Sequence, residues 1–174
     1  CALPPAAADA AHDDLASASA DELWLAFRSL VNVRPPWPAP AEFLAAQDEL
    51  LQGLIADAGV ATLADTTPSP TDPRLRLWRG DITTLAVDAI VNAANSGMTG
   101  CYIPNHRCID NAIHTFAGVE LRLTCEQLME QQGYPEPTGQ AKITPAFNLP
   151  CRYVLHTVGP VSYTHLTLPT ILLV

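Results

Sequence analysis

Two short apolar runs with a long helical segment between them constrain the fold of this chain more than any other feature. Residues 87–94 (VDAIVNAA) and 151–158 (CRYVLHTV) have the length and apolar character of buried strands, and residues 141–144 (AKIT) form a third candidate. Between Ile109 and Leu128 apolar residues recur at helical spacing, with Gly118 as a candidate break. This alternation predicts an α/β sheet with helices on its faces.

Two further helices are expected ahead of this region. The first starts at Asp21 and is stopped by Pro35, and the second runs from Ala41 to an end signal at Gly59. Residues at helical spacing mark the inner faces: Leu23, Trp24, Phe27, Leu30 and Val31 in the first helix; Phe43, Leu44, Gln47, Leu50, Leu51, Leu54 and Ile55 in the second. Two short helices bury little surface alone, so we expect them to pack on the α/β region.

The chain divides into four predicted segments. Residues 1–20 are Ala- and Pro-rich and expected to be disordered. Residues 21–72 form the helical extension and run into a Pro/Thr linker, TTPSPTDP, and residues 73–160 form the α/β region. Residues 161–174 (VSYTHLTLPTILLV) break the pattern and resemble the conceptual translation of a sequencing-library adapter. We expect them to be non-native read-through, with a genuine terminal strand as the alternative, and the α/β region to be truncated.

The charge pattern bears on the partners of the chain. Of 18 acidic residues, 11 lie at or before Asp72 beside two arginines, whereas seven of each sign follow it. An acidic flank argues against nucleic-acid binding, and no apolar run approaches the roughly 18 residues of a membrane span. Five cysteines without a secreted-domain pattern predict a reducing, cytoplasmic compartment.

Cys101, His106 and Cys108 form the strongest candidate metal site. Two thiolates and one imidazole within eight residues suit zinc. Three protein ligands leave one coordination position open, which is typical of a catalytic rather than a structural ion. The alternative is two small buried hydrophobic residues beside an unrelated histidine.

A family resemblance rests on several motifs in a fixed order: RGDIT, VDAIVNAANS, DNAIH, PTGQAKIT and YVLHTVGP. Together they resemble a macrodomain, the ADP-ribose-binding α/β/α module. The insertion GCYIPNHRC, and the N-terminal LVNVRPP and QDELL, resemble the zinc-containing subgroup of protein-ADP-ribose hydrolases. The resemblance covers roughly residues 21–160 and implies a three-layer α/β/α fold, of which only the N-terminal half is present, preceded by the helical extension.

Polar residues at the ends of the strands are candidate ligand contacts. Asp81 can accept a hydrogen bond from an adenine amino group, and Ile82 can offer a backbone N–H; alternatively, Asp81 only caps its own turn. Asn92 and Asn95 follow the first apolar run, at the sheet edge where α/β proteins bind ligands. The resemblance implies that Asn95 meets the distal ribose, and Asn92 is a candidate structural residue.

The start of the helix at Cys108, Ile109, Asp110 and Asn111 is a candidate pyrophosphate site. A helix N-terminus presents unpaired N–H groups and partial positive charge. Asp110 is a candidate N-cap of this helix and a candidate catalytic group acting on the ribose, together with Asn95; it either only caps the helix or does both. Other histidines and cysteines have no partners at ligand spacing: His114 is expected on a helix face near the site, and Cys125, Cys151 and His156 in the core.

The resemblance implies zinc-dependent hydrolysis of ADP-ribose from mono-ADP-ribosylated protein side chains. Zinc would then lie near the anomeric end of the distal ribose, where it polarises a ribose oxygen or activates a water, and Asp110 positions or deprotonates the attacking group. Two alternatives stay open. One is an ADP-ribose reader without turnover, and the other is an inactive fragment that lacks the second phosphate loop of macrodomains.

Overall fold

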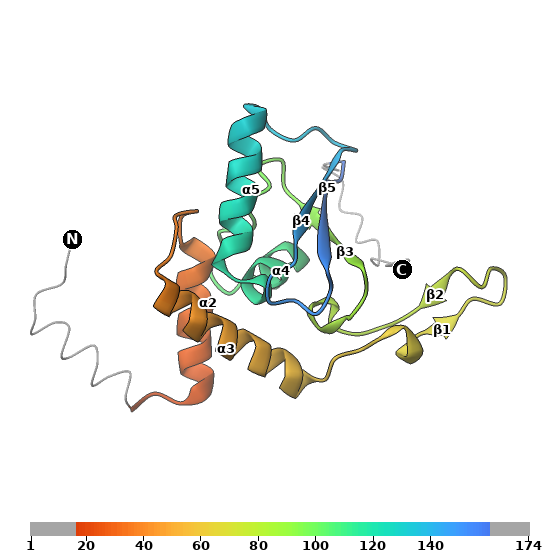
Figure 1. Cartoon of the computed structure of the whole chain (residues 1–174), viewed down its shortest axis with the longest axis horizontal. Helices are drawn as coiled ribbons and strands as arrows, with labels where there is room; N and C mark the ends of the chain where they lie inside the picture. Colours follow the sequence, from red (N-terminus) through yellow and green to blue (C-terminus); the bar gives the residue numbers. More distant parts are fainter. Residues whose placement is uncertain (1–16, 161–174) are drawn as a thin grey trace, which may run out of the picture.

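The computed structural model describes residues 17–160, which form a three-stranded mixed sheet with helices packed on it (Figure 1). The strands are β3 (Ala89–Ala94), β4 (Ala141–Pro145) and β5 (Tyr153–Val158). β5 is central, parallel to β3 and antiparallel to β4. These three strands confirm the apolar runs expected from the sequence, within a residue or two at their ends. The period-2 alternation at Leu75 and Leu77 predicted a further strand ending at Asp81, but only the two-residue strand β2 (Arg76–Leu77) forms there.

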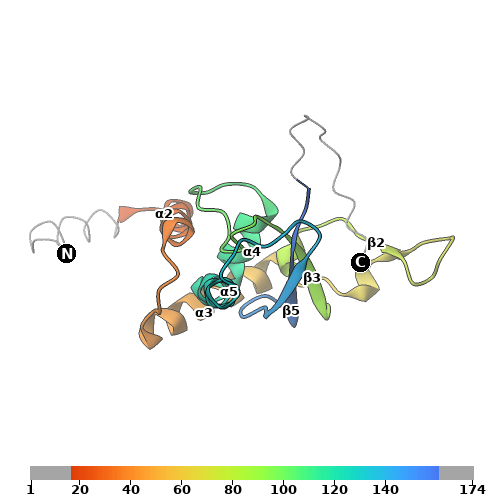
Figure 2. The same cartoon turned by 90° about the horizontal axis from the view of Figure 1, so that it is seen from above.

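Two helices connect β3 to β4. α4 (Ile109–Ala117) is followed at once by α5 (Val119–Gln132), and Gly118 between them has a φ of 101°. Only glycine adopts this conformation without strain, which confirms the break that the sequence predicted. α4 and α5 lie together on one side of the sheet (Figure 2).

One face of the sheet forms the core. Ile90 of β3 and Val154 and Val158 of β5 point toward α4 and α5, where Ile113 and Leu121 are fully buried. On the opposite face Val91, Ile143 and Tyr153 are 42%, 56% and 39% exposed. Among the described residues the helices thus cover one face only, and the α/β class expected from the sequence is confirmed.

The helical extension is built as predicted. α2 (Ala20–Val33) is capped by Ser19 and Glu22 in a reciprocal capping box, and α3 (Ala41–Ala58) ends at Gly59. Both helices pack on the α/β region: the Trp24 ring lies 5.5 Å from that of Phe116, and the Asn32 amide donates to Thr115 Oγ1 at 2.9 Å.

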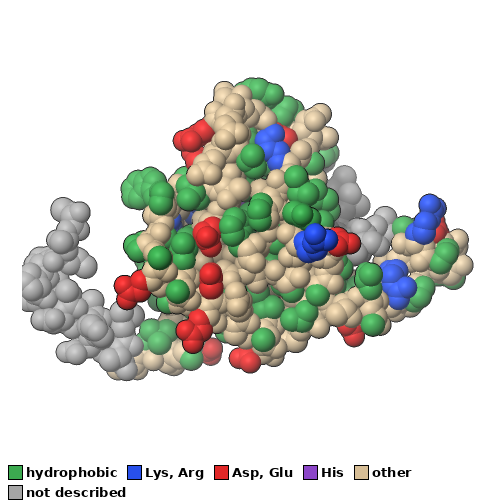
Figure 3. Space-filling view, viewed as in Figure 1, with side chains coloured by type: hydrophobic (Ala, Val, Ile, Leu, Met, Phe, Trp, Pro, Cys, Tyr) green, Lys and Arg blue, Asp and Glu red, His purple; other side chains and the backbone are tan. Residues whose placement is uncertain are grey.

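The apolar stripe of the extension is only partly covered. Leu23 and Leu30 of α2 are 39% and 67% exposed and Leu50 of α3 is 41% exposed, so the prediction that these three residues face inward was wrong. All three line an apolar groove of about 570 Å³ between α2 and α3, which no described residue fills. On the face shown in Figure 3, acidic side chains are spread over this part of the surface, and most of the visible Lys and Arg side chains lie over the sheet and the hairpin.

The predicted Pro/Thr linker contains a small hairpin. β1 (Thr67–Pro68) pairs antiparallel with β2 (Arg76–Leu77), with short 3₁₀ helices before and after it at Leu63–Asp65 and Ile82–Thr84. The turn is closed by Asp72, whose Oδ1 accepts from the Arg74 amide at 2.9 Å. Side-chain bonds to the backbone therefore order the turn of this Pro/Thr segment.

Two of the predicted segments lie wholly or mostly beyond the described residues. Residues 1–16 and 161–174 are not described, so the read-through segment and most of the disordered segment remain predictions. Within residues 17–160 no helix combines the length and the apolar character that a bilayer crossing requires.

Candidate functional site

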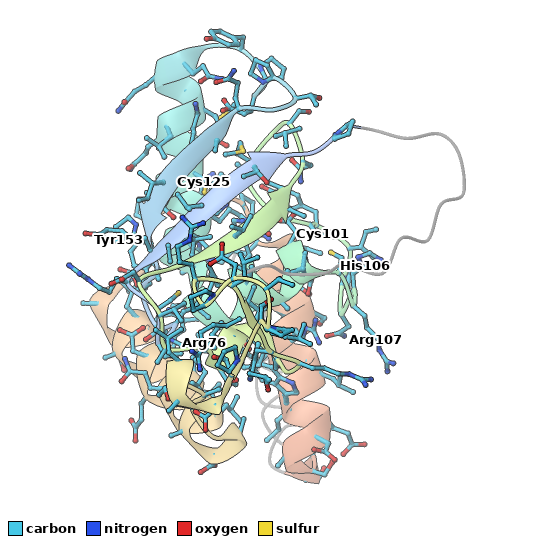
Figure 4. All side chains as sticks on the ribbon, turned by 90° about the vertical axis from the view of Figure 1, so that its right-hand side faces the viewer. Arg76, Cys101, His106, Arg107, Cys125 and Tyr153 are labelled. Carbon is cyan, nitrogen blue, oxygen red and sulfur yellow. The ribbon has the colours of Figure 1, made fainter. Side chains whose placement is uncertain are left out.

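Cys101, His106 and Cys108 come together on the loop between β3 and α4. Cys101 Sγ lies 3.5 Å from His106 Nδ1, and one ligand atom from each of the three residues lies within 4.8 Å of the others. Zinc bonds of about 2.3 Å to sulfur and 2.0 Å to nitrogen place ligand atoms roughly this far apart. Figure 4 shows Cys101 and His106 close to each other, with Arg107 projecting away.

The surroundings of Cys108 disfavour its thiolate form. Burial raises the pKa of the Cys108 thiol, and the neighbouring Cys101 raises it further. A bound divalent ion reverses this effect, because it stabilises thiolates. The donor set and its spacing thus fit the zinc ion that the sequence predicts.

The helical extension holds the loop in place. The Arg28 guanidinium donates to His106 O at 2.8 Å and to Asn111 Oδ1 at 2.9 Å, and Asn32 Oδ1 accepts from the Asn105 amide at 2.9 Å. The Asn111 side chain also donates to Ile103 O at 3.1 Å. The arrangement of Cys101, His106 and Cys108 therefore depends on contacts with α2, some 80 residues earlier in the chain.

A pocket of about 390 Å³ joins the two predicted binding segments. It is lined by Asp81 and Ile82 on one side and by Cys108 and Ile109, at the start of α4, on the other. Asp81 and Ile82 are 27 residues or more from α4 in sequence, so only the fold could establish this proximity. The adenine and pyrophosphate candidates thus share one cavity.

Asp81 combines the two roles that the sequence left open. Its Oδ1 caps the 3₁₀ turn by accepting from the Thr83 amide at 2.9 Å and from Thr83 Oγ1 at 2.7 Å. The residue is nevertheless exposed and lines the pocket, and both of these hydrogen bonds use Oδ1. Its second oxygen, Oδ2, is therefore suited to accept from a ligand.

Cys108 is the N-cap of α4. Its Sγ accepts from the Asn111 amide at 3.3 Å, so the same sulfur caps the helix and belongs to the candidate metal cluster. Asn111 itself is fully buried, and its side chain is used to hold the loop. Of the predicted phosphate-binding residues, Ile109 and Cys108 line the pocket, whereas Asp110 and Asn111 do not.

Asp110 is a buried carboxylate at the edge of this site. Its Oδ1 accepts from the Asn92 amide at 2.8 Å, and its Oδ2 lies 3.5 Å from Asn95 Nδ2. Burial raises the pKa of the carboxyl, and the Asn92 bond opposes this. The two predicted catalytic residues, Asp110 and Asn95, are therefore neighbours, and Asp110 lies two residues along the chain from the metal-ligand candidate Cys108.

The chain matches the Macro domain family over residues 91–168. It is 60% identical over 149 residues to a protein-ADP-ribose hydrolase of Treponema medium, covering 84% of this chain and 57% of that protein. It is 51% identical over 142 residues to a protein-ADP-ribose hydrolase of Staphylococcus aureus, covering 82% and 53%. The chain thus spans just over half the length of these curated relatives.

A solved structure agrees with these matches. The Trypanosoma brucei macrodomain in complex with ADP superposes with a TM-score of 0.51 at 32% identity, over 79% of this chain and 60% of that one. This chain has the macrodomain fold. Its helices and mixed sheet are consistent with the predicted three-layer α/β/α arrangement, and the matches support a family of macrodomain ADP-ribose hydrolases.

Sequence reasoning missed two basic residues of the macrodomain pocket. Arg79 and Arg107 line the cavity beside Asp81 and Cys108, together with the Trp78 ring. The sequence motifs pointed to the helix N-terminus alone as the source of positive charge. Arg79 nevertheless lies just before the GDI turn, and Arg107 lies between two metal-ligand candidates. Their positions beside the motifs were the available signal.

The fold also gathers histidines that are isolated in the sequence. His114, Cys125 and His156 have ligand atoms within 4.8 Å of one another, and all three are buried. His114 lies near the site as expected, with Nε2 3.6 Å from Asp110 Oδ1, but it faces the core. Cys125, Cys151 and His156 are core residues, which confirms the expectation for them.

Proposed function

We propose that the protein hydrolyses ADP-ribose from mono-ADP-ribosylated protein side chains. The observation that carries this proposal is the placement of a buried, hydrogen-bonded carboxylate, Asp110, on the same helix start that closes the nucleotide-sized pocket of Asp81 and Ile82. The names of the Treponema and Staphylococcus relatives support the same activity. The partners are then ADP-ribose and an ADP-ribosylated protein.

In this proposal, different residues bind the adenine, the pyrophosphate and the distal ribose of ADP-ribose. Asp81 Oδ2 accepts from the adenine amino group and the Ile82 amide donates to the ring, which fixes the base. The first-turn amides of α4 and the guanidinium groups of Arg79 and Arg107 face the pyrophosphate. Asn95, at the other end of this arrangement, bonds the hydroxyls of the distal ribose.

Asp110 acts on the nucleophile in this proposal. Its raised pKa brings the carboxyl closer to neutral pH, which makes it a better proton acceptor than an exposed aspartate. The Asn92 and Asn95 amides hold both carboxylate oxygens, so the group can orient a water beside the ribose. Orientation and deprotonation are both compatible with this geometry.

We further propose that Cys101, His106 and Cys108 hold zinc. When bound, zinc supplies a Lewis acid that polarises an oxygen or lowers the pKa of a coordinated water to about 7. The open fourth position of a three-ligand site suits this role. Zinc thiolates also require a reducing compartment, and the cytoplasm stays our prediction for it.

The experiment compares binding and turnover in the same variants. We expect Asp110→Asn to lower the release of ADP-ribose from a mono-ADP-ribosylated protein at least about 100-fold while calorimetric affinity for free ADP-ribose stays within about threefold. The Treponema medium relative serves as the positive control for the assay. Binding without turnover in the parent chain, while the control is active, would instead make this macrodomain a reader.

The metal is tested separately. Elemental analysis of the purified chain is expected to give about one zinc per molecule, lost in Cys108→Ala and retained in the matched control Cys151→Ala, whose sulfur is buried outside the cluster. A parent chain that is free of metal and still releases ADP-ribose contradicts the zinc assignment but leaves the hydrolase proposal standing.

A further inference from the structure

A chain of four buried polar side chains crosses the sheet beneath Asp110. Asn92 Nδ2 lies 2.8 Å from Asp110 Oδ1 and 3.1 Å from His156 Nδ1. His156 Nε2 lies 3.0 Å from Thr144 Oγ1. All four residues are at most 6% exposed. Asp110 belongs to α4, Asn92 to β3, His156 to β5 and Thr144 to β4.

Strand register creates this chain. Asn92 and His156 are partners in the parallel β3–β5 pair, so their side chains lie next to each other on the same face of the sheet. Thr144 sits on that face of β4, next to β5. The polar chain is therefore a consequence of sheet geometry and does not depend on a mobile loop.

The hydrogen atoms in this series of hydrogen bonds can be placed in only one way. The Asn92 NH₂ group can only donate, so His156 Nδ1 must be the unprotonated ring nitrogen and Nε2 must carry the hydrogen that Thr144 Oγ1 accepts. Turning the Asn92 amide over places its Oδ1 against the Asp110 carboxylate oxygen, and two acceptors repel each other there. The Asn92 Oδ1 atom instead stays buried without a partner, which indicates that the two NH₂ bonds dictate the orientation.

Burial keeps the His156 ring uncharged, which this placement of hydrogen atoms requires. Burial lowers the pKa of His156 to about 4, so the ring is uncharged at neutral pH. Its neighbour Cys125, 3.8 Å from Nε2, has a pKa raised by burial to about 12 and is a neutral thiol. The nearby His114 ring, whose centroid is 5.8 Å away, is also held neutral by burial, which lowers its pKa.

We propose that His156 and Asn92 are positioning residues for Asp110. The Nε2–H tautomer of His156 holds the Asn92 amide, and that amide fixes the Asp110 carboxylate toward the distal ribose. Neither residue lines the pocket of Asp81 and Cys108. The inference rests on the proposed role of Asp110 in hydrolysis, and it adds residues that act through that carboxylate.

Two substitutions at His156 separate positioning from stability. Asn in His156→Asn can place an acceptor oxygen near the position of Nδ1, whereas His156→Leu removes every polar atom at similar volume. We expect His156→Leu to lower kcat about tenfold or more, with KM and ADP-ribose affinity within about twofold, and His156→Asn to restore most of kcat. Thermal melts of both variants confirm folding, and Thr144→Val serves as the milder second variant if His156→Leu fails to fold.

Imidazole ¹⁵N NMR tests the chain without any assay of activity. The His156 ring is expected to show Nε2 protonated and Nδ1 unprotonated in the parent chain. Asn92→Asp replaces the donor with a carboxylate acceptor and is expected to move the hydrogen to Nδ1. A protonated Nδ1 in the parent chain overturns the proposal, as does an unchanged kcat in the folded His156→Leu variant. A parent chain with no turnover removes the proposed function and the positioning role together, while the tautomer result still reports the hydrogen-bond chain.

Discussion

At the scale of single residues, this macrodomain uses buried polar side chains where a core ordinarily holds apolar ones. Asn92 and His156 are both fully buried, and each is paired with at least one neighbour from another element. An unpaired buried polar group costs about 1–3 kcal/mol, so such residues have to satisfy one another. Each of these residues thereby constrains the position of the next, and the last residue in this series of hydrogen bonds is Asp110.

The buried histidines predict how stability depends on pH. The folded-state pKa of His156 is about 4 and its unfolded value about 6.5, so the unfolded state binds more protons between these values. The stability present above pH 6.5 is thus lost as pH falls toward 4, by about 2 kcal/mol between pH 7 and 5. His114 acts in the same direction, and the raised pKa of Asp110 opposes it.

Urea denaturation followed by tryptophan fluorescence at pH 7 and pH 5 measures this loss. In His156→Asn the group that titrates is absent, so the difference between the two pH values is expected to shrink. An equal difference in the parent chain and the variant shows that His156 is not the source.

Asp81 is expected to contribute to the binding of ADP-ribose. Asp81→Ala removes the carboxylate that faces the pocket and is expected to weaken ADP-ribose binding by about 1–3 kcal/mol in calorimetry. Asp88→Ala is the control, because Asp88 is exposed away from the pocket and only 3.6 Å from the exposed Arg152 guanidinium. If the unsubstituted protein and both variants bind ADP-ribose equally well, Asp81 has only a structural role through its hydrogen bonds with Thr83.

At the scale of elements, the α4–α5 junction couples the helical extension to the core. A Cβ on Gly118 lies 2.5 Å from Gln47 Nε2 of α3, and Gln47 Oε1 accepts from the Val119 amide at 2.9 Å. α3 therefore packs directly against the start of α5. The break that the sequence predicts is also the contact point between two parts of the chain.

Gly118→Ala is expected to destabilise the chain more than Gly133→Ala. Both glycines have positive φ, but Gly133 (φ 78°, ψ 6°) is in the left-handed helical region, where alanine costs about 1 kcal/mol, whereas Gly118 (φ 101°, ψ 170°) is in a region that glycine alone adopts readily and where alanine costs more. Only Gly118→Ala adds the clash with Gln47, because nothing lies within 4 Å of a Cβ on Gly133. The clash is expected to add about 1–3 kcal/mol in urea denaturation. Equal losses indicate that Gln47 moves aside without cost.

At the scale of the whole molecule, one arginine connects the helical extension, the loop between β3 and α4, and α5. Arg122 is 5% exposed, and its guanidinium donates to Thr99 O at 2.8 Å, Asn32 O at 2.8 Å and Arg34 O at 2.7 Å. It also lies 4.2 Å from the centroid of the Tyr102 ring. These bonds satisfy the last carbonyls of α2, which have no partners within the helix.

Arg122→Met is expected to cost about 3 kcal/mol, because it leaves several carbonyls unpaired. Hydrogen exchange is expected to rise in α2 and in residues 99–108 while β5 stays protected. Arg152→Met is the control, since its 70% exposed side chain contributes about 0–1 kcal/mol. Unchanged exchange in α2 shows that Trp24 and Asn32 hold the extension without the arginine.

The amino-acid sequence by itself determined the elements and the candidate residues. Short apolar runs indicated β3 and β5, which are buried in the sheet, and a period of 3.6 indicated α2 to α5, because one face of each helix must be apolar. Gly118 indicated the break between α4 and α5 because it has no side chain. The motif order indicated the macrodomain fold, and the short spacing of Cys101, His106 and Cys108 was visible because all three lie on one loop.

Only the tertiary structure decided which distant residues meet. Asp81 faces Cys108 across a pocket, Arg28 holds the loop at His106, and Asn92 pairs with His156 through a strand register that no local pattern specifies. Packing also left Leu50 exposed although its spacing pointed inward, since α2 and α3 do not close over it. Local sequence sets the direction of each side chain, but contacts between remote segments depend on how the elements pack together.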